Sequence, residues 1–392
     1  MEEKFKELNF PTMNHRFMMP KLVSHLYKEL EEAQNNWLHN KVSLKKKYSM
    51  YIDKESNYYR SISGFQSIHP AIVSTIEKTD SIHNKYMLEI NNNVYSIYFY
   101  FPSTSKHVNK DPFFHDCVMK IYFWLYLIQP YIRKNCSKQM NIHIWFSNHK
   151  KMISKNSSEL LDAIHVNTAF TSSCMPTTNI ILYRKEEWFK VFIHETFHNL
   201  GLDFSDKNNP IIESKINQLF KVKNNNDIRI FESYCEIWAE TMHCFLVAFL
   251  MKTNFHDFKK EFQDNMNLEL EFSLFQCAKI LHKYHITYLD LITKENAFEE
   301  ISPITSYYFI KTIFMFHFSE FEKWCIEHNT FDLIFQFNNK NIHIDSYIHL
   351  IKDLYKNKKF VDTLNHFSTL FSRLERKNTG IMNTMRMTIN EI

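Results

Sequence analysis

The stretch KVFIHETFHNLGLDF, residues 190–204, decides how this chain is interpreted. It contains His194, Glu195 and His198 in the pattern H-E-x-x-H. The uncharged residues around these three predict a buried helix over residues 185–200, in which side chains four positions apart lie on one face. Both imidazoles can therefore point at one metal ion, and zinc is held at this spacing without strain. The stretch predicts a zinc site.

The glutamate and a glycine add to this interpretation. Glu195 is poorly placed to be a ligand beside His194, but it can take a proton from a water that zinc activates. Gly201 is expected to end the helix in the left-handed conformation. The alternative is a core helix with two hydrogen-bonded histidines. Three polar residues on so apolar a helix would then need buried partners of their own.

A catalytic zinc ion also needs a third protein ligand and one open position. The metzincin pattern would place a His or Asp where Phe204 stands, so that pattern is excluded. Asp203 comes one residue too early to be this ligand. It either helps to fix a histidine or the loop, or it is a turn residue that follows the helix.

A second helix, predicted over residues 228–251, offers better candidates for the third ligand. It contains the sequence ESYCEIWAETMH, in which Glu236, Glu240 and His243 are spaced so as to lie on one face. The apolar residues between the two glutamates predict that this helix is buried on most sides. From spacing alone, Glu236, Glu232 and His243 all remain candidates.

The pair of motifs HETFH and EIWAE resembles the gluzincin branch of the zincin metallopeptidases. The resemblance covers about residues 110–255. It implies that His194, His198 and Glu236 hold Zn²⁺, and that Glu240 orients a ligand histidine through its other ring nitrogen. The chain as a whole also resembles uncharacterised H-E-x-x-H proteins of large double-stranded DNA viruses, in keeping with its abundant Asn, Lys and Ile.

The order of the predicted elements agrees with this resemblance. In zincins, a helix and several strands precede the active-site helix, and an edge strand lines the substrate cleft. Here the segment His165–Thr171 would be that edge strand, and its backbone could pair with an extended peptide. The alternative is an ordinary strand of the sheet. The predicted elements are a buried helix that ends near Pro130 and strands at residues 140–147, 164–173 and 179–184.

We therefore expect an α+β fold, in which a zincin-like mixed sheet carries the active-site helix and a mainly helical C-terminal half follows. Near the N-terminus, Pro20 is expected to open a helix that runs to about Lys46, and a β-hairpin is expected around Asn91–Asn93. The predicted segments are an accessory region (1–105), a metallopeptidase core (106–255), a helical subdomain (256–377) and a polar tail without clear fold (378–392).

Three further residues have possible roles in the predicted site. Tyr307 and Tyr308 could reach over the metal and stabilise the oxyanion that peptide hydrolysis creates, although tyrosines on such a helix more often belong to the core. Cys174 could block zinc as a thiolate. We expect Cys174 to be an ordinary free thiol rather than a group that blocks zinc. Seven scattered cysteines without a C-x-x-C pair are typical of a protein in a reducing compartment.

Composition excludes several other classes of protein. The net charge of +4 is too small to predict nucleic-acid binding. The N-terminus lacks the apolar core of a signal peptide, and the longest apolar runs are much shorter than the roughly 20 residues of a membrane helix. We therefore expect a cytoplasmic protein, in host cytoplasm or a virion if it is viral, with neither membrane nor nucleic acid as partner.

The function predicted from these observations is zinc-dependent hydrolysis of a peptide or protein substrate, with Glu195 as general base. One alternative is a catalytically idle zincin-fold protein with a structural or interaction role, such as a virion component. Another is a zinc hydrolase that does not act on peptides. The intact Glu195 favours the enzyme, since a site kept only for folding needs ligands but no base.

Overall fold

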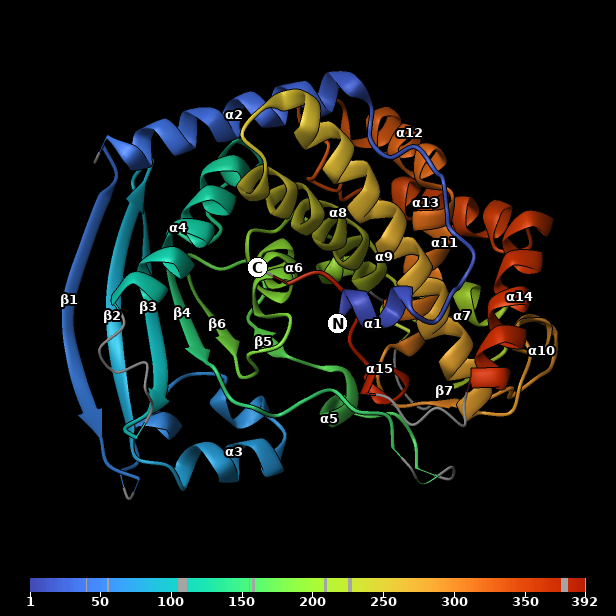
Figure 1. Ribbon diagram of the computed structural model, residues 1–392, viewed down its shortest axis with the longest axis horizontal. Helices are drawn as coiled ribbons and strands as arrows, with labels where there is room; N and C mark the ends of the chain where they lie inside the picture. Colours follow the sequence, from blue (N-terminus) through green and yellow to red (C-terminus); the bar gives the residue numbers. More distant parts are fainter. Residues whose placement is uncertain are drawn as a thin grey trace. The chain divides into compact units, whose positions relative to one another are not determined.

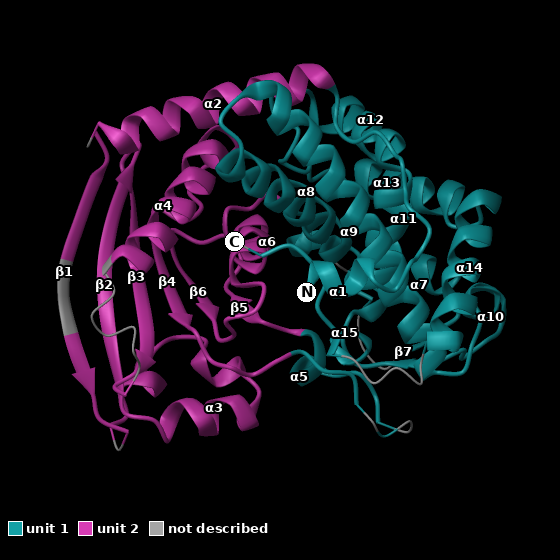
Figure 2. Cartoon of the chain, viewed as in Figure 1, with its two compact units in different colours: residues 1–19, 151–166, 203–392 teal, residues 20–150, 167–202 magenta. Residues whose placement is uncertain are grey.

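The computed structural model confirms the predicted α+β class (Figure 1). It divides into two compact units, each made of segments that are distant in sequence (Figure 2). Unit 1 comprises residues 1–19, 151–166 and 203–392, and unit 2 comprises residues 20–150 and 167–202. These units cut across the predicted segments. The structure describes residues 1–39, 41–54, 56–104, 111–154, 156, 159–207, 210–224, 228–374 and 380–391.

Unit 2 is built on a mixed sheet. Among the described residues it has six strands in the order β1-β2-β3-β4-β6-β5. Strand β2 is antiparallel to both of its neighbours, β1 and β3. Strands β3, β4 and β6 are parallel, and β5 is antiparallel to β6 at the edge. The strands are β1 (Ser43–Ile52), β2 (Ser81–Ile90), β3 (Asn93–Pro102), β4 (Gln139–Trp145), β5 (Ala169–Thr171) and β6 (Thr177–Leu182).

Helices cover both faces of this sheet. On one face, Phe114 of α4 (Asp111–Ile128) packs against Phe99 of β3, with ring centroids 5.1 Å apart. On the other face, the apolar side of α3 (Pro70–Glu77) joins a buried cluster that includes Tyr100 and Trp145. Successive strand residues point to opposite faces, so the alternation along β3 divides its aromatic side chains between the two layers.

The β2–β3 hairpin confirms the prediction made from the asparagine run. Asn91 and Asn92 both have positive φ, of 49° and 64°. A two-residue turn with two positive φ angles matches the twist of antiparallel strands, and asparagine tolerates this conformation better than most residues.

The long N-terminal helix is shorter than predicted. Helix α2 spans Pro20–Leu38, and the chain then forms β1, which pairs with β2 along its length. The expectation of helix up to Lys46 is therefore wrong. The physical reason is tertiary: β1 gains a full ladder of hydrogen bonds from β2, and this pairing outweighs the weak local helix preference of the segment.

The predicted second strand is also shorter than expected. Only Ala169–Thr171 forms β5, while His165 lies in the short helix α5 (Ala163–Val166) of unit 1. A local turn explains the difference: His165 Nδ1 accepts a hydrogen bond from the Asp162 N–H, and the His165 N–H donates to the Asp162 carbonyl. These local bonds compete with a sheet ladder.

Unit 1 is mainly helical. Its longest helices, α8 (Phe231–Met251) and α9 (Phe255–Lys283), pack against each other, and α14 (Lys358–Leu374) packs on α9. The other helices are α1 (Glu2–Lys6), α7 (Pro210–Asn217), α10 (Tyr288–Thr293), α11 (Lys311–Phe316), α12 (Phe318–Asn329), α13 (Asn341–Leu354) and α15 (Gly380–Asn383), with a π-helix at Thr305–Ile310 and the short strands β7 (Lys223–Asn224) and β8 (Glu299–Glu300).

The described part of the C-terminal segment, residues 380–391, is not a tail without fold. After α15, the side chains from Thr384 to Asn390 are buried within unit 1. The Met385 N–H donates to the Lys151 carbonyl, and Glu269 of α9 accepts hydrogen bonds from Thr388, Ile389 and Asn390. The polar composition predicted an unfolded tail, but the polar residues of this segment form hydrogen bonds with distant parts of the chain.

The expectation that all cysteines are free thiols is wrong for one pair. Cys136 and Cys174 of unit 2 form a disulfide across 38 residues. Cys174 therefore has no thiolate to offer to a metal in this structure. The other five cysteines are free and buried: Cys117, Cys235, Cys244, Cys277 and Cys325. Among the described helices, none is both long enough and apolar enough to span a bilayer.

Candidate metal centre

Helix α6 (Trp188–Asn199) of unit 2 carries the H-E-x-x-H motif, inside the predicted range. It directly follows β6, so the sheet fixes the position of its first turn. Along this helix His194 and Glu195 are buried, whereas His198 is half-buried. Ionisable side chains that are buried on a helix need polar partners or a ligand.

The two histidines are brought together as predicted. His194 Nε2 and His198 Nε2 lie 3.2 Å apart, and their rings are inclined by 76°. Two nitrogens bound to one tetrahedral zinc at 2.0–2.1 Å would be separated by about 3.3 Å. The contact is also short enough for a hydrogen bond between neutral rings. The spacing of these two nitrogens is therefore compatible with a shared zinc ion.

A hydrogen-bonded threonine fixes the middle of α6. Thr196 Oγ1 accepts a hydrogen bond of 2.8 Å from Trp124 Nε1 of α4 and donates to the Ile193 carbonyl. All three residues are fully buried. This link sets the rotation of α6 about its axis, and with it the direction of both histidines.

Asn199 ties the end of α6 to the sheet. Its Oδ1 accepts hydrogen bonds from the hydroxyls of Ser137 and Thr178, the latter at 2.8 Å, and its Nδ2 donates to Thr171 Oγ1 of the edge strand β5 at 3.0 Å. Sequence reasoning missed Asn199 and Thr196. The available signal was a polar residue at each of these positions on a helix with apolar flanks.

Gly201 ends the helix in the left-handed conformation that the sequence predicts. Its φ is +69°, and the Leu202 N–H reaches back to the Phe197 carbonyl. A Cβ at this position would lie 2.8 Å from Cys136 Sγ and 3.3 Å from Cys174 Cβ. Glycine is therefore required here both by the backbone and by the disulfide packed against it.

Glu195 has an ionisable neighbour that the sequence did not indicate. Burial raises the pKa of Tyr183, at the end of β6, above its usual value; Arg184 lowers it and the Glu195 carboxylate raises it further. Tyr183 therefore stays protonated at neutral pH.

The candidates for the third ligand lie on α8, which belongs to unit 1. Glu232, Glu236, Glu240 and His243 are all buried on this helix. The spacing of Glu236, Glu240 and His243 predicts that they share one face of the helix, and Glu232 stands one turn before Glu236. Carboxylates are seldom buried without partners, so this stripe of four polar residues requires an explanation in charge pairing or ligand binding.

Asp203 is buried in unit 1, two residues before the 3₁₀ turn Ser205–Lys207. Its Oδ1 accepts a hydrogen bond of 3.0 Å from Ser205 Oγ, and its Oδ2 lies 3.7 Å from Cys235 Sγ of α8. These contacts fix the loop after α6 to α8. Of the roles predicted for Asp203, these contacts with Ser205 and Cys235 support the one in which it fixes the loop.

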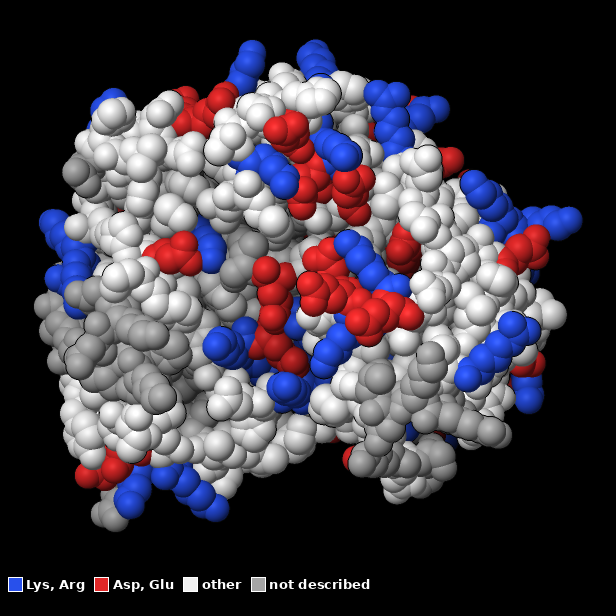
Figure 3. Space-filling model, in the orientation of Figure 1, with Lys and Arg blue, Asp and Glu red and all other residues white. Residues whose placement is uncertain are grey.

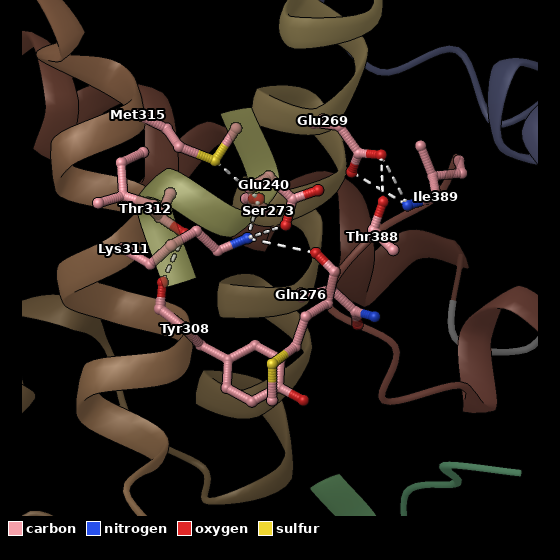
Figure 4. A network of polar contacts seen from close by, with 12 residues as sticks. Glu240, Glu269, Ser273, Gln276, Tyr308, Lys311, Thr312, Met315, Thr388 and Ile389 are labelled. Carbon is pink, nitrogen blue, oxygen red and sulfur yellow. Dashed lines mark hydrogen bonds and ion pairs between the residues drawn. The ribbon is translucent and has the colours of Figure 1, made fainter. Parts of the chain in front are cut away.

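Glu240 takes part in a buried ion pair (Figure 4). Lys311 Nζ lies 3.4 Å from its Oε2 and donates to Ser273 Oγ at 2.7 Å and to the Met387 carbonyl at 3.3 Å. Both charged side chains are almost completely buried. The role of Glu240 in orienting a ligand histidine stays a prediction. Its ion pair with Lys311 was not predicted from the sequence.

The acidic residues of this network also form a cluster with a thiol. Glu240, Cys244 and Glu269 offer ligand atoms within 4.8 Å of one another. Burial and both carboxylates raise the pKa of Cys244, which favours the thiol over the thiolate that binds metals. Lys311 supplies positive charge, and Glu269 accepts hydrogen bonds from the Thr388 hydroxyl and the Ile389 N–H (Figure 4). The cluster therefore serves to hold the C-terminal segment.

The two predicted oxyanion donors lie in the π-helix of unit 1. Tyr308 is buried, and its hydroxyl donates a hydrogen bond of 2.6 Å to the Met385 carbonyl. Tyr307 is also largely buried. The hydroxyl proton of Tyr308 is thus already used in fixing the C-terminal segment, while the role of Tyr307 stays a prediction.

Charge on the molecular surface is mixed. On the described residues of the face in Figure 3, acidic and basic side chains are interspersed rather than separated into one basic area. Comparison with protein-family models, with curated proteins and with solved structures found no match to this chain. The function must therefore be argued from the residues themselves.

Proposed function

We propose that the chain is a zinc-dependent peptidase in which His194 and His198 hold the metal and Glu195 is the general base. The observation that carries this proposal is the 3.2 Å separation of the two Nε2 atoms on a helix with apolar flanks. Zinc bound there would polarise a substrate carbonyl and lower the pKa of a water.

The chain's own residues supply the remaining chemistry. Glu195 would accept a proton from the attacking water and pass it to the leaving amine. The antiparallel edge strand β5, linked to α6 through Asn199, is suited to bind an extended peptide by strand addition.

The third ligand in this proposal is Glu236, on the strength of the E-x-x-A-E resemblance. Glu232 and His243 are the alternatives on the same helix. Metal analysis separates them: wild type should hold one zinc per chain, and His198→Ala and Glu236→Ala should each lose it. His349→Ala, which removes an exposed histidine of α13, is the matched control and should keep the zinc.

Each result has a definite meaning. If folded wild type takes up no zinc when it is offered, the motif is a coincidence of register and the proposal fails. If only His198→Ala loses zinc, the third ligand is Glu232 or His243.

Turnover distinguishes an enzyme from an idle fold. Glu195→Gln should keep the zinc and lose peptide hydrolysis by at least about 100-fold, the usual contribution of a general base. A zinc-loaded wild type that cleaves no member of a peptide library would favour the structural or interaction protein instead.

A further inference from the structure

Unit 1 contains a serine–histidine pair that the zinc chemistry does not use. Ser346 Oγ of α13 lies 2.8 Å from His328 Nε2 of α12. The other ring nitrogen, His328 Nδ1, lies 2.8 Å from the Trp324 carbonyl oxygen. The three groups form the arrangement of nucleophile, base and orienting acceptor that activates serine in hydrolases.

The carbonyl decides which nitrogen carries the proton. A carbonyl oxygen can only accept, so Nδ1 must be the protonated nitrogen and, in the neutral ring, Nε2 presents its lone pair to Ser346. The Ser346 hydroxyl therefore donates to Nε2. Trp324 Nε1 donates to Ser346 Oγ at 2.9 Å, which fixes the serine rotamer.

Packing holds the base in this orientation. The Trp324 ring stacks on His328 with centroids 4.3 Å apart and an angle of 12°. His343 lies edge-on to the same ring at 5.2 Å and 87°. Ser346 and His328 are both half-buried, so part of each residue remains exposed to solvent.

We propose that Ser346 is the nucleophile of a second, metal-independent site, with His328 as its base. Ser346 Oγ would attack the carbonyl carbon of a small carboxylic ester while His328 Nε2 takes the hydroxyl proton. The alcohol would leave with that proton, and water would then release the acid from the acyl-serine and restore the hydroxyl.

The orienting group defines the substrate class. A carbonyl carries only a partial negative charge and stabilises an imidazolium less than a carboxylate does. Esters need less help than amides, because an alcohol is a better leaving group than an amine. The site is therefore suited to small esters rather than to peptides, and it does not depend on the zinc proposal.

The experiment is labelling of the full-length chain with a small fluorophosphonate probe in the presence of a metal chelator, followed by peptide mapping. Wild type should carry the label on Ser346, with fluoride as the leaving group. His328→Gln should slow this labelling by about 100-fold or more. Ser319→Ala is the matched control and should label like wild type, because Ser319 on α12 is exposed and donates to Glu320 rather than to a histidine.

Circular dichroism of each variant shows whether slower labelling is due to unfolding. The labelling of wild type does not depend on the folding of any variant. Folded wild type without label on Ser346 would overturn the proposal. Equal labelling of folded His328→Gln would also overturn it, since the contact would then only join α12 to α13.

Discussion

The side-chain amide of Asn199 donates a hydrogen bond of 3.0 Å to Thr171 Oγ1, and so connects the residue after the second histidine to the edge strand of the sheet. Through the same side chain, the hydroxyls of Ser137 and Thr178 are satisfied within the core of unit 2. One residue thus sets the position of the helix end relative to the strand that would bind a peptide.

Asn199→Ala should lower the free energy of unfolding by about 1–2 kcal/mol, because it removes the amide acceptor of Thr178 and the donor to Thr171, while Ser137 keeps the Asn199 backbone carbonyl as an acceptor. Chemical denaturation would measure this. Asn141→Ala is the control: its amide bonds Asn179 on the half-buried sheet surface, and its loss should cost less than about 1 kcal/mol. Equal losses in the two variants would contradict the special role of Asn199.

Gly201→Ala should destabilise the chain by about 2–4 kcal/mol, because it adds left-handed strain to a clash with Cys136 Sγ. The matched control is Gly380→Ala in α15, where a Cβ would meet no atom within 4 Å. That variant should change stability by less than about 1 kcal/mol. Thermal unfolding of both variants is the measurement, and a Gly201→Ala protein as stable as wild type would refute the argument.

Glu300 should make unit 1 less stable as the pH rises. Burial raises the pKa of this carboxyl from 4.5 to about 7, against the hydrogen bonds that it accepts from Thr305. Above pH 4.5 the unfolded chain gains an ionised glutamate that the folded chain does not, so folding is penalised progressively up to about pH 7. The total loss is about 3 kcal/mol.

Glu300→Gln keeps an acceptor for Thr305 and cannot ionise. Urea unfolding at pH 5 and pH 8 should therefore show a larger loss of stability in wild type than in this variant. Parallel pH dependences would mean that Glu300 is ionised in the folded chain.

Glu269→Ala should cost about 3–5 kcal/mol, because the buried carboxylate is the shared acceptor for Thr388, Ile389 and Asn390. Limited proteolysis should then release the C-terminal segment. Glu299→Ala, which removes an exposed ion pair with Lys223, is the control and should cost at most about 1 kcal/mol. A C-terminal segment that stays protected in Glu269→Ala would contradict this account.

Local patterns predicted the elements around the candidate centre. The H-E-x-x-H helix, its glycine end and the β2–β3 hairpin depend on spacing and on backbone preferences that each residue carries with it. These features are readable from the sequence because their causes lie within a few residues.

The features that the sequence did not predict depend on contacts between residues that are distant along the chain. Strand β1, the disulfide and the buried C-terminal segment depend on partners that are distant in sequence: β2 for Ser43–Ile52, Cys174 for Cys136, and Glu269 for Thr388. The intrinsic propensity of a residue cannot report a partner that lies far away along the chain.

The sequence by itself determined that His194 and His198 share one face of a helix, because a helix places residues four apart on one face whatever surrounds it. Only the tertiary structure decided how those side chains are held. Trp124 and Asn199 fix the rotation and the end of α6, and Lys311 reaches Glu240, because hydrogen bonds and ion pairs between elements form only after the chain has packed.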